Sequence, residues 1–122
     1  MIISNINNSY NTGNTALLKS YMLVGCRNVK NAGLSMQLSF IPVNSEQPAH
    51  DHEPEQVYYI IRGTGLMIID DEREPVHAGD AIYVPSNKKH GIKNVGTETL
   101  EYLSANAPSF PEEYENRLWP AT

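Results

Sequence analysis

Apolar and polar residues alternate along short stretches of the chain, which is typical of half-buried β-strands. Between Leu34 and Ile41 every second residue is apolar. The intervening positions are Ser35, Gln37 and Ser39. We expect the apolar members to lie in the core or in a cavity wall: Met36, Leu38 and Phe40.

The same signals predict a series of further strands. The expected strands cover residues 21–24, 56–61, 66–69 and 81–84, a segment around Ile92, and residues 99–103. A loop is expected over 42–48, a turn over 63–65, and a solvated acidic hairpin over 70–74. With 8 glycines and 8 prolines as turn residues, this spacing favours an all-β antiparallel sandwich or barrel.

A short C-terminal helix is expected over residues 109–119. Ser109 to Glu112 has the form of a capping box, and Pro120 would end the helix. Residues four apart would share one helical face: Phe110, Tyr114 and Leu118. We expect this helix to pack on the outside of the barrel; a lid or a dimer contact is the alternative.

Composition limits the possible classes of function. A chain of 122 residues forms one domain, and its net charge of −5 argues against a nucleic-acid partner. No apolar run is long enough for a membrane helix, and the first residues lack the features of a secretory signal. The single cysteine, Cys26, is expected to be an inert thiol, and we expect the protein to be cytoplasmic.

All four histidines lie between residues 50 and 90. His50 and His52 would point to the same side of an extended strand, and His90 follows a predicted turn. Three histidines converging inside a barrel would form a site for a divalent metal. His77 lies in the predicted turn before Gly79, and we expect it to be a surface residue.

The spacing of these residues resembles the two motifs of the cupin superfamily, especially its small single-domain members. The first motif, G(X)5HxH(X)3–4E(X)6G, corresponds to residues 44–63, and the second, G(X)5PxG(X)2H(X)3N, corresponds to residues 79–94. The matching residues are His50, His52, Gln56, Gly63, Gly79, Pro85, His90 and Asn94. The resemblance implies a double-stranded β-helix, or jelly-roll barrel, formed by a single cupin domain over residues 1–122.

Three positions depart from the motifs. Asn44 and Asn87 replace glycines, and asparagine is the residue after glycine that best tolerates a left-handed backbone. Gln56 stands at the position of the usual glutamate ligand. Glu55 is an alternative ligand, although the interval to Gly63 and the alternation of a strand favour Gln56.

The resemblance implies one bound divalent transition metal, Mn, Fe, Ni, Co or Zn, held by His50, His52, Gln56 and His90. Four neutral ligands would leave the full charge on the metal, which would favour an anionic, chelating substrate. We therefore expect a metalloenzyme of isomerase, lyase or decarboxylase type that acts on a small oxygen-rich or carboxylate-bearing molecule. A dioxygenase and a non-enzymatic sugar or carboxylate binding module are the alternatives.

Two further expectations concern a catalytic group and a partner. Tyr58 lies at the same strand parity as Gln56 and is the candidate general acid, although a buried, hydrogen-bonded tyrosine is the simpler interpretation. The resemblance also implies a homodimer, because short cupins commonly pair through their sheets. The segment from Met1 to Ile6 could supply an added strand.

Overall fold

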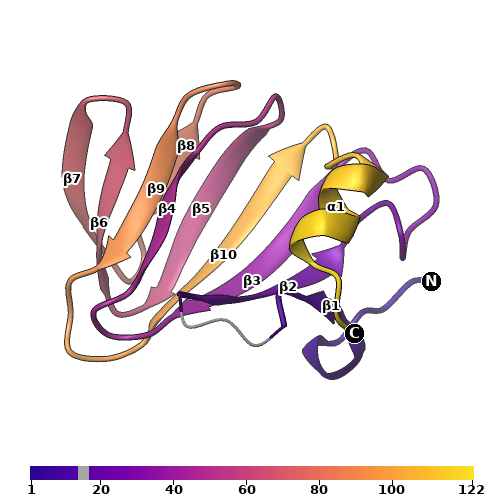
Figure 1. Ribbon diagram of the computed structural model, residues 1–122, viewed down its shortest axis with the longest axis horizontal. Coiled ribbons are helices and arrows are strands. Elements are labelled where there is room, and N and C mark those ends of the chain that lie inside the picture. Colours follow the sequence, from indigo (N-terminus) through magenta and orange to yellow (C-terminus); the bar gives the residue numbers. More distant parts are fainter. Residues whose placement is uncertain (14–16) are drawn as a thin grey trace.

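The chain folds into two antiparallel β-sheets that face each other, with one short helix at the end opposite β7 (Figure 1). The computed structural model describes residues 1–13 and 17–122. Its elements are η1 (Ile6–Asn8), β1 (Tyr10–Asn11), β2 (Lys19–Val24), β3 (Ser35–Ile41), β4 (Glu46–His50), β5 (Glu55–Arg62), β6 (Thr64–Ile69), β7 (Glu72–His77), β8 (Ala81–Val84), β9 (His90–Asn94), β10 (Leu100–Ala107) and α1 (Glu112–Leu118).

The strand order brings together segments that are far apart in the sequence. The larger sheet has the order β1-β2-β3-β10-β5-β8, and the smaller sheet has the order β4-β9-β6-β7. Apolar side chains from both sheets form the core between them, including Ile41, Ile60, Met67 and Ile92. This architecture confirms the all-β jelly-roll fold with a C-terminal helix that the sequence predicts.

The expectation that the apolar residues of β3 face the core or the cavity is wrong, because the strand turns its other face inward. Ser35, Gln37 and Ser39 are buried, whereas the apolar residues between them are only half-buried on the outer face of the larger sheet. The buried polar groups are tolerated because neighbouring strands supply hydrogen-bond partners; for example, Ser39 Oγ donates to Ser20 Oγ at 2.9 Å. Alternation along a strand shows that its two faces differ, but not which of them faces inward.

Several boundaries also differ from the sequence-based expectations. The predicted loop over 42–48 contains the start of β4, and the acidic segment 70–74 runs into β7, which ends at His77. The sequence pattern did not reveal β7 as a strand, because five of its six side chains are exposed and only Val76 is buried. A short edge strand with many charged residues is an ordinary way to limit sheet-to-sheet association.

The two asparagines that replace motif glycines adopt the left-handed backbone that those positions require. The φ angle is +65° at Asn44 and +63° at Asn87. Gly63 and Gly79, at the other two turn positions, have φ angles of +92° and +94°. The turn geometry of both motifs is therefore kept without glycine at 44 and 87.

The C-terminal helix is present, but it begins later than expected and without a capping box. The residue before α1 is Pro111, which makes no side-chain cap, and Ser109 Oγ instead donates to the carbonyl of Ala32. Phe110 and Trp119 bury themselves against Met22 in a second apolar cluster. Among the described residues, no helix is long and apolar enough to cross a lipid bilayer.

Candidate metal centre

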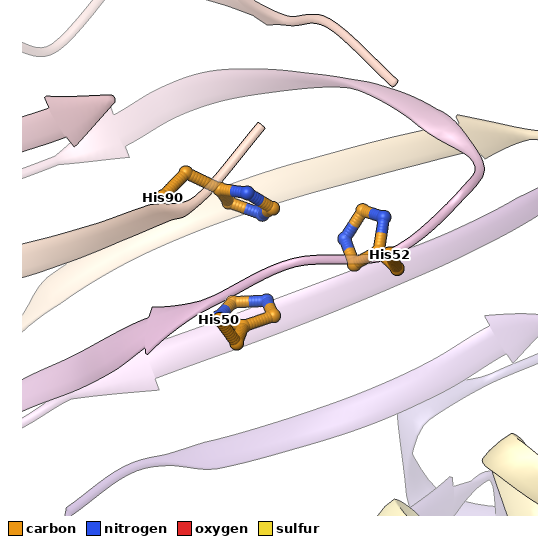
Figure 2. A group of neighbouring side chains, drawn as sticks. All are labelled: His50, His52 and His90. Carbon is orange, nitrogen blue, oxygen red and sulfur yellow. The ribbon is translucent and has the colours of Figure 1, made fainter. Parts of the chain in front are cut away.

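Three histidines from two parts of the sequence meet at one end of the smaller sheet. His50 ends β4, His52 lies in the loop that follows it, and His90 begins β9, directly opposite His50 in the strand register. One ring nitrogen of each histidine lies within 4.8 Å of one from each of the others. Figure 2 shows the three rings turned toward a common space. His52 reaches this space from a loop, and not from a continuous strand as the sequence suggested.

The backbone around each imidazole determines which ring nitrogen is protonated. His50 Nδ1 lies 3.0 Å from the carbonyl oxygen of Pro48. His52 Nδ1 lies 2.8 Å from that of Pro54, and His90 Nδ1 lies 2.8 Å from that of Lys88. A carbonyl oxygen only accepts hydrogen bonds, so each Nδ1 donates its proton. In the neutral ring, each Nε2 therefore keeps a free lone pair, which is the form that binds a metal.

Burial keeps two of these rings neutral. His90 is only 1% exposed, and burial lowers its pKa to about 4; burial also lowers the pKa of His50. Within residues 1–13 and 17–122, His90 Nε2 is the buried side-chain nitrogen or oxygen atom without a hydrogen-bond partner. An orphaned buried acceptor beside two further imidazole lone pairs fits a divalent transition metal, because such ions prefer neutral imidazole nitrogen.

The two candidates for a fourth ligand lie on opposite faces of β5. Gln56 is buried, and its Oε1 lies 3.1 Å from His52 Nε2, while its Nε2 donates to Gln37 Oε1 at 3.3 Å. Glu55 points away from the histidines and accepts a hydrogen bond from the exposed Tyr83 hydroxyl at 2.9 Å. The structure thus places Gln56, and not Glu55, beside the three rings.

A cavity of about 500 Å³ opens beside the histidines. Tyr58 lies in its wall, fully buried, and its ring stacks on that of Tyr102 with centroids 4.8 Å apart. Both hydroxyls donate to Gln47 Oε1 at 3.0 Å. Burial raises the pKa of both phenols, so Tyr58 remains protonated at neutral pH. The Tyr58 proton is held by Gln47 in this arrangement.

Sequence reasoning missed most of the cavity wall. Inward-facing polar side chains line one part, and aromatic residues at and around α1 line another; these groups include Gln37, Ser39, Ser104, Phe110, Tyr114 and Trp119. The Phe110 ring lies 5.0 Å from the His52 ring, so the C-terminal segment borders the histidine cluster. The helix therefore contributes a wall of the cavity, beyond the outside packing that the sequence suggested. The sequence did contain one indication of the polar part of the wall, because Ser35, Gln37 and Ser39 occupy every second position and therefore share one face of the strand.

Two other candidate residues lie outside the site. His77 is exposed and lies 3.8 Å from the Asp80 carboxylate, as expected of a surface histidine. Cys26 lies beside the buried carboxylate of Glu115, and burial together with that carboxylate raises its pKa to about 11. A thiol with so high a pKa carries almost no thiolate at neutral pH, which agrees with the expected inert role.

Comparison with known proteins agrees with the motifs and the fold. Residues 37–106 match the model of the cupin domain. An uncharacterised protein of Methanocaldococcus jannaschii is 36% identical over 85 residues, which are 69% of this chain and 68% of that protein. The oxalate-binding protein of Thermotoga maritima is 35% identical over 65 residues, which are 52% of this chain and 54% of that protein.

A solved structure supports the same assignment. An RmlC-like cupin from Shewanella frigidimarina superposes with a TM-score of 0.75 at 21% sequence identity, and the match covers 92% of this chain and 94% of that one. At this level of identity the structural match shows the fold alone. Together with the match over residues 37–106, it places this chain in the cupin family.

Proposed function

We propose that this protein is a metal-dependent enzyme that acts on a small oxygen-rich or carboxylate-bearing molecule, by isomerase, lyase or decarboxylase chemistry. The observation that carries the proposal is the convergence of one ring nitrogen from each of His50, His52 and His90, with the Oε1 atom of Gln56 3.1 Å from His52 Nε2. In the form that binds a metal, all four side chains are uncharged. A bound divalent ion would keep its full positive charge and would stabilise a developing enolate or enediolate as a Lewis acid.

The groups lining the cavity support a substrate rich in oxygen atoms. Buried side chains of Gln37, Ser39 and Ser104 line it and make one part of its wall polar. The two hydroxyl protons are donated to Gln37 and Ser20, so the serine oxygens remain as acceptors for the alcohol groups of a substrate. Arg117 of α1 also lines the cavity and is exposed, which places one cationic side chain where an anionic group enters. Oxalate binding in the relative from Thermotoga maritima, as stated in that protein's name, supports the same substrate class.

The first experiment tests whether the protein binds a metal, because the proposed reaction depends on it. Purified protein should contain about one divalent transition metal ion, Mn, Fe, Ni, Co or Zn, per chain by elemental analysis. His50→Ala combined with His52→Ala should abolish this content. His77→Ala is the matched control, because this histidine is exposed and outside the cluster, and it should bind metal as the wild type does. A metal-free wild type, or equal metal in the double variant, would refute the proposal.

Two alternatives share the same site. A dioxygenase would consume oxygen with an aromatic or carboxylate substrate, whereas the proposed isomerase or lyase activity continues without oxygen. A non-enzymatic binding module would bind the same molecules without turnover. A panel of hydroxy acids and uronates, assayed aerobically and anaerobically with the metal-loaded protein, separates the three: product that forms only in air identifies the dioxygenase, and binding without product identifies the module.

Tyr58 is part of the proposal as general acid. Its hydroxyl is protonated and lines the cavity, but it would need to exchange Gln47 for the substrate before donating. Tyr58→Phe should therefore lower kcat while leaving metal content unchanged. An unchanged kcat would leave this tyrosine with the packing role shown by its stacking on Tyr102.

The outer face of the larger sheet is the proposed homodimer contact. Val57, Tyr59 and Ile61 alternate along β5 with the buried residues, and they are 41–47% exposed; Tyr83 of β8, at 56%, extends this apolar face. A second copy of the chain is the proposed occupant, because an exposed apolar face can pack against the same face of another copy about a twofold axis. Sedimentation should give a dimer that Ile61→Lys disrupts and the control Val95→Lys, on a loop beyond β9, does not; a monomeric wild type would refute this contact.

A further inference from the structure

We infer that Gln37 is a positioning residue for the metal: with Asn106 and Ser104 it fixes which atom of the Gln56 amide faces the three histidines. This inference rests on the proposed metal centre and concerns how this chain presents its unusual fourth ligand. The observation behind it is a continuous series of buried hydrogen bonds. A backbone carbonyl at one end of the series determines which group donates and which accepts at each following step.

The four side chains are brought together by the register of three neighbouring strands. Gln37 of β3 lies directly opposite Ser104 of β10, and Gln56 of β5 lies directly opposite Asn106 of β10. All four face the interior and are 2–5% exposed. Directly opposed side chains on one face of a sheet are within hydrogen-bonding reach. Because so little of each side chain is exposed, each amide finds its donors and acceptors mainly among these neighbours.

The carbonyl of Pro108 determines which group donates at each step of the series. Asn106 Nδ2 donates to the carbonyl oxygen of Pro108 at 3.1 Å, and that oxygen only accepts. Asn106 Oδ1 is therefore the acceptor for Gln37 Nε2, at 2.9 Å. Gln37 Oε1 in turn accepts from Ser104 Oγ at 2.7 Å and from Gln56 Nε2 at 3.3 Å. Gln56 is thereby left with its Oε1 toward the histidines.

This orientation creates a contact that a bound cation would stabilise. Gln56 Oε1 lies 3.1 Å from His52 Nε2. The proton of His52 is on Nδ1, which faces the carbonyl of Pro54. In the neutral His52 ring two acceptors therefore face each other, an unfavourable arrangement that a bound metal ion, or a proton on Nε2, would relieve. The hydrogen-bond series thus maintains an electron-rich site in advance of metal binding.

The series is needed because the ligand is glutamine. A glutamate has two equivalent oxygens, so either orientation offers an acceptor to a cation. The amide of Gln56 has one oxygen, and rotation by half a turn would present N–H groups to the positive charge. Gln37 disfavours this reversal, because it would bring the Gln56 oxygen against Gln37 Oε1, and two acceptors in contact repel. Partners behind a ligand typically change metal affinity by about 10–100-fold when they are removed.

The test is a double-mutant cycle on metal affinity, measured by titration with Co(II). Gln37→Met removes the acceptor at similar side-chain volume and should weaken Co(II) binding about tenfold. In the Gln56→Ala background the same substitution should have no effect, because Gln37 acts through Gln56. The visible spectrum of the Co(II)-loaded Gln37→Met protein should resemble that of Gln56→Ala, as both lose the amide oxygen.

The outcomes separate this inference from the metal proposal. A wild type that does not bind Co(II) would refute the metal centre itself. Co(II) binding that Gln37→Met leaves unchanged, or that it weakens equally in the Gln56→Ala background, would overturn the positioning role alone. Ser35→Ala is the control, because Ser35 is a buried polar residue of β3 that does not line the cavity, and it should keep wild-type affinity. If Gln37→Met does not fold, Asn106→Ala is measured in the same two backgrounds, with the same expected and contradicting results.

Discussion

A buried ion pair fixes the C-terminal helix against the barrel, and breaking it gives a quantitative test of the structure. Glu115 is 0% exposed, and its carboxylate accepts hydrogen bonds from the backbone N–H of Cys26 at 2.9 Å and from Arg27 Nε at 3.4 Å. The Arg27 guanidinium also donates to the carbonyls of Glu115 and Trp119 and lies over the Tyr10 ring. These contacts join α1, which borders the cavity, to the turn after β2.

Glu115→Ala should destabilise the fold by about 3 kcal/mol, the lower end of the range for removing one partner of a buried pair. The lower end applies because Arg27 keeps its two carbonyl acceptors and its contact with Tyr10. At roughly 2.1 cal/mol/K of unfolding entropy per residue, this loss corresponds to a fall in Tm of about 12 °C for this chain length. Urea unfolding followed by circular dichroism measures the free energy, and a thermal scan measures Tm.

Two controls sharpen this prediction. Glu113→Ala changes an exposed carboxylate of the same helix and should alter stability by less than about 0.5 kcal/mol. Gly25→Ala would place a Cβ in steric conflict with the Glu115 carboxylate, so it should destabilise the wild type but much less the Glu115→Ala variant. A fall in Tm of under about 3 °C for Glu115→Ala would show that the pair contributes little, and the account of how α1 is held would be wrong.

Three further predictions concern the metal and the thiol. Metal at about 100 times its Kd should stabilise the protein by about 2.7 kcal/mol in thermal unfolding, and His90→Ala should remove this effect; equal stabilisation of the variant would contradict the assigned ligands. Gln56→Glu should tighten Co(II) binding about tenfold and weaken the binding of oxalate to the loaded protein, because a carboxylate offsets part of the metal charge; weaker Co(II) binding would argue against Gln56 as a ligand. Cys26, whose pKa is raised to about 11, should react with a thiol reagent at pH 8 about 100-fold more slowly than a cysteine with the ordinary pKa of 9.0. Labelling at the rate of a free cysteine would show that the thiol does not lie beside Glu115 as described.

The motif residues could be recognised from the chain because local geometry constrains them. Asn44 and Asn87 occupy turns that need positive φ, and only a few residue types tolerate that conformation. The interval from Gln56 to Gly63 matches the cupin motif and so indicates Gln56 as the ligand position, and alternation along β5 places its neighbour Glu55 on the opposite face. Such features depend on a few adjacent residues and therefore appear in the sequence itself.

The inward face of β3 and the orientation of Gln56 depend on residues that are distant in sequence. Gln37 bonds to Asn106, 69 positions away, and its burial is tolerated only because β10 lies beside β3 and supplies that partner. Alternation predicted a strand over these residues, but the choice between its apolar and polar faces required both neighbouring strands. The cavity wall from α1 has the same origin, since Glu115 is held by Arg27 from a turn 88 positions earlier. Short-range periodicity thus decided the strands, and the resemblance in motif spacing indicated the candidate ligands, whereas long-range pairing decided which polar groups surround them.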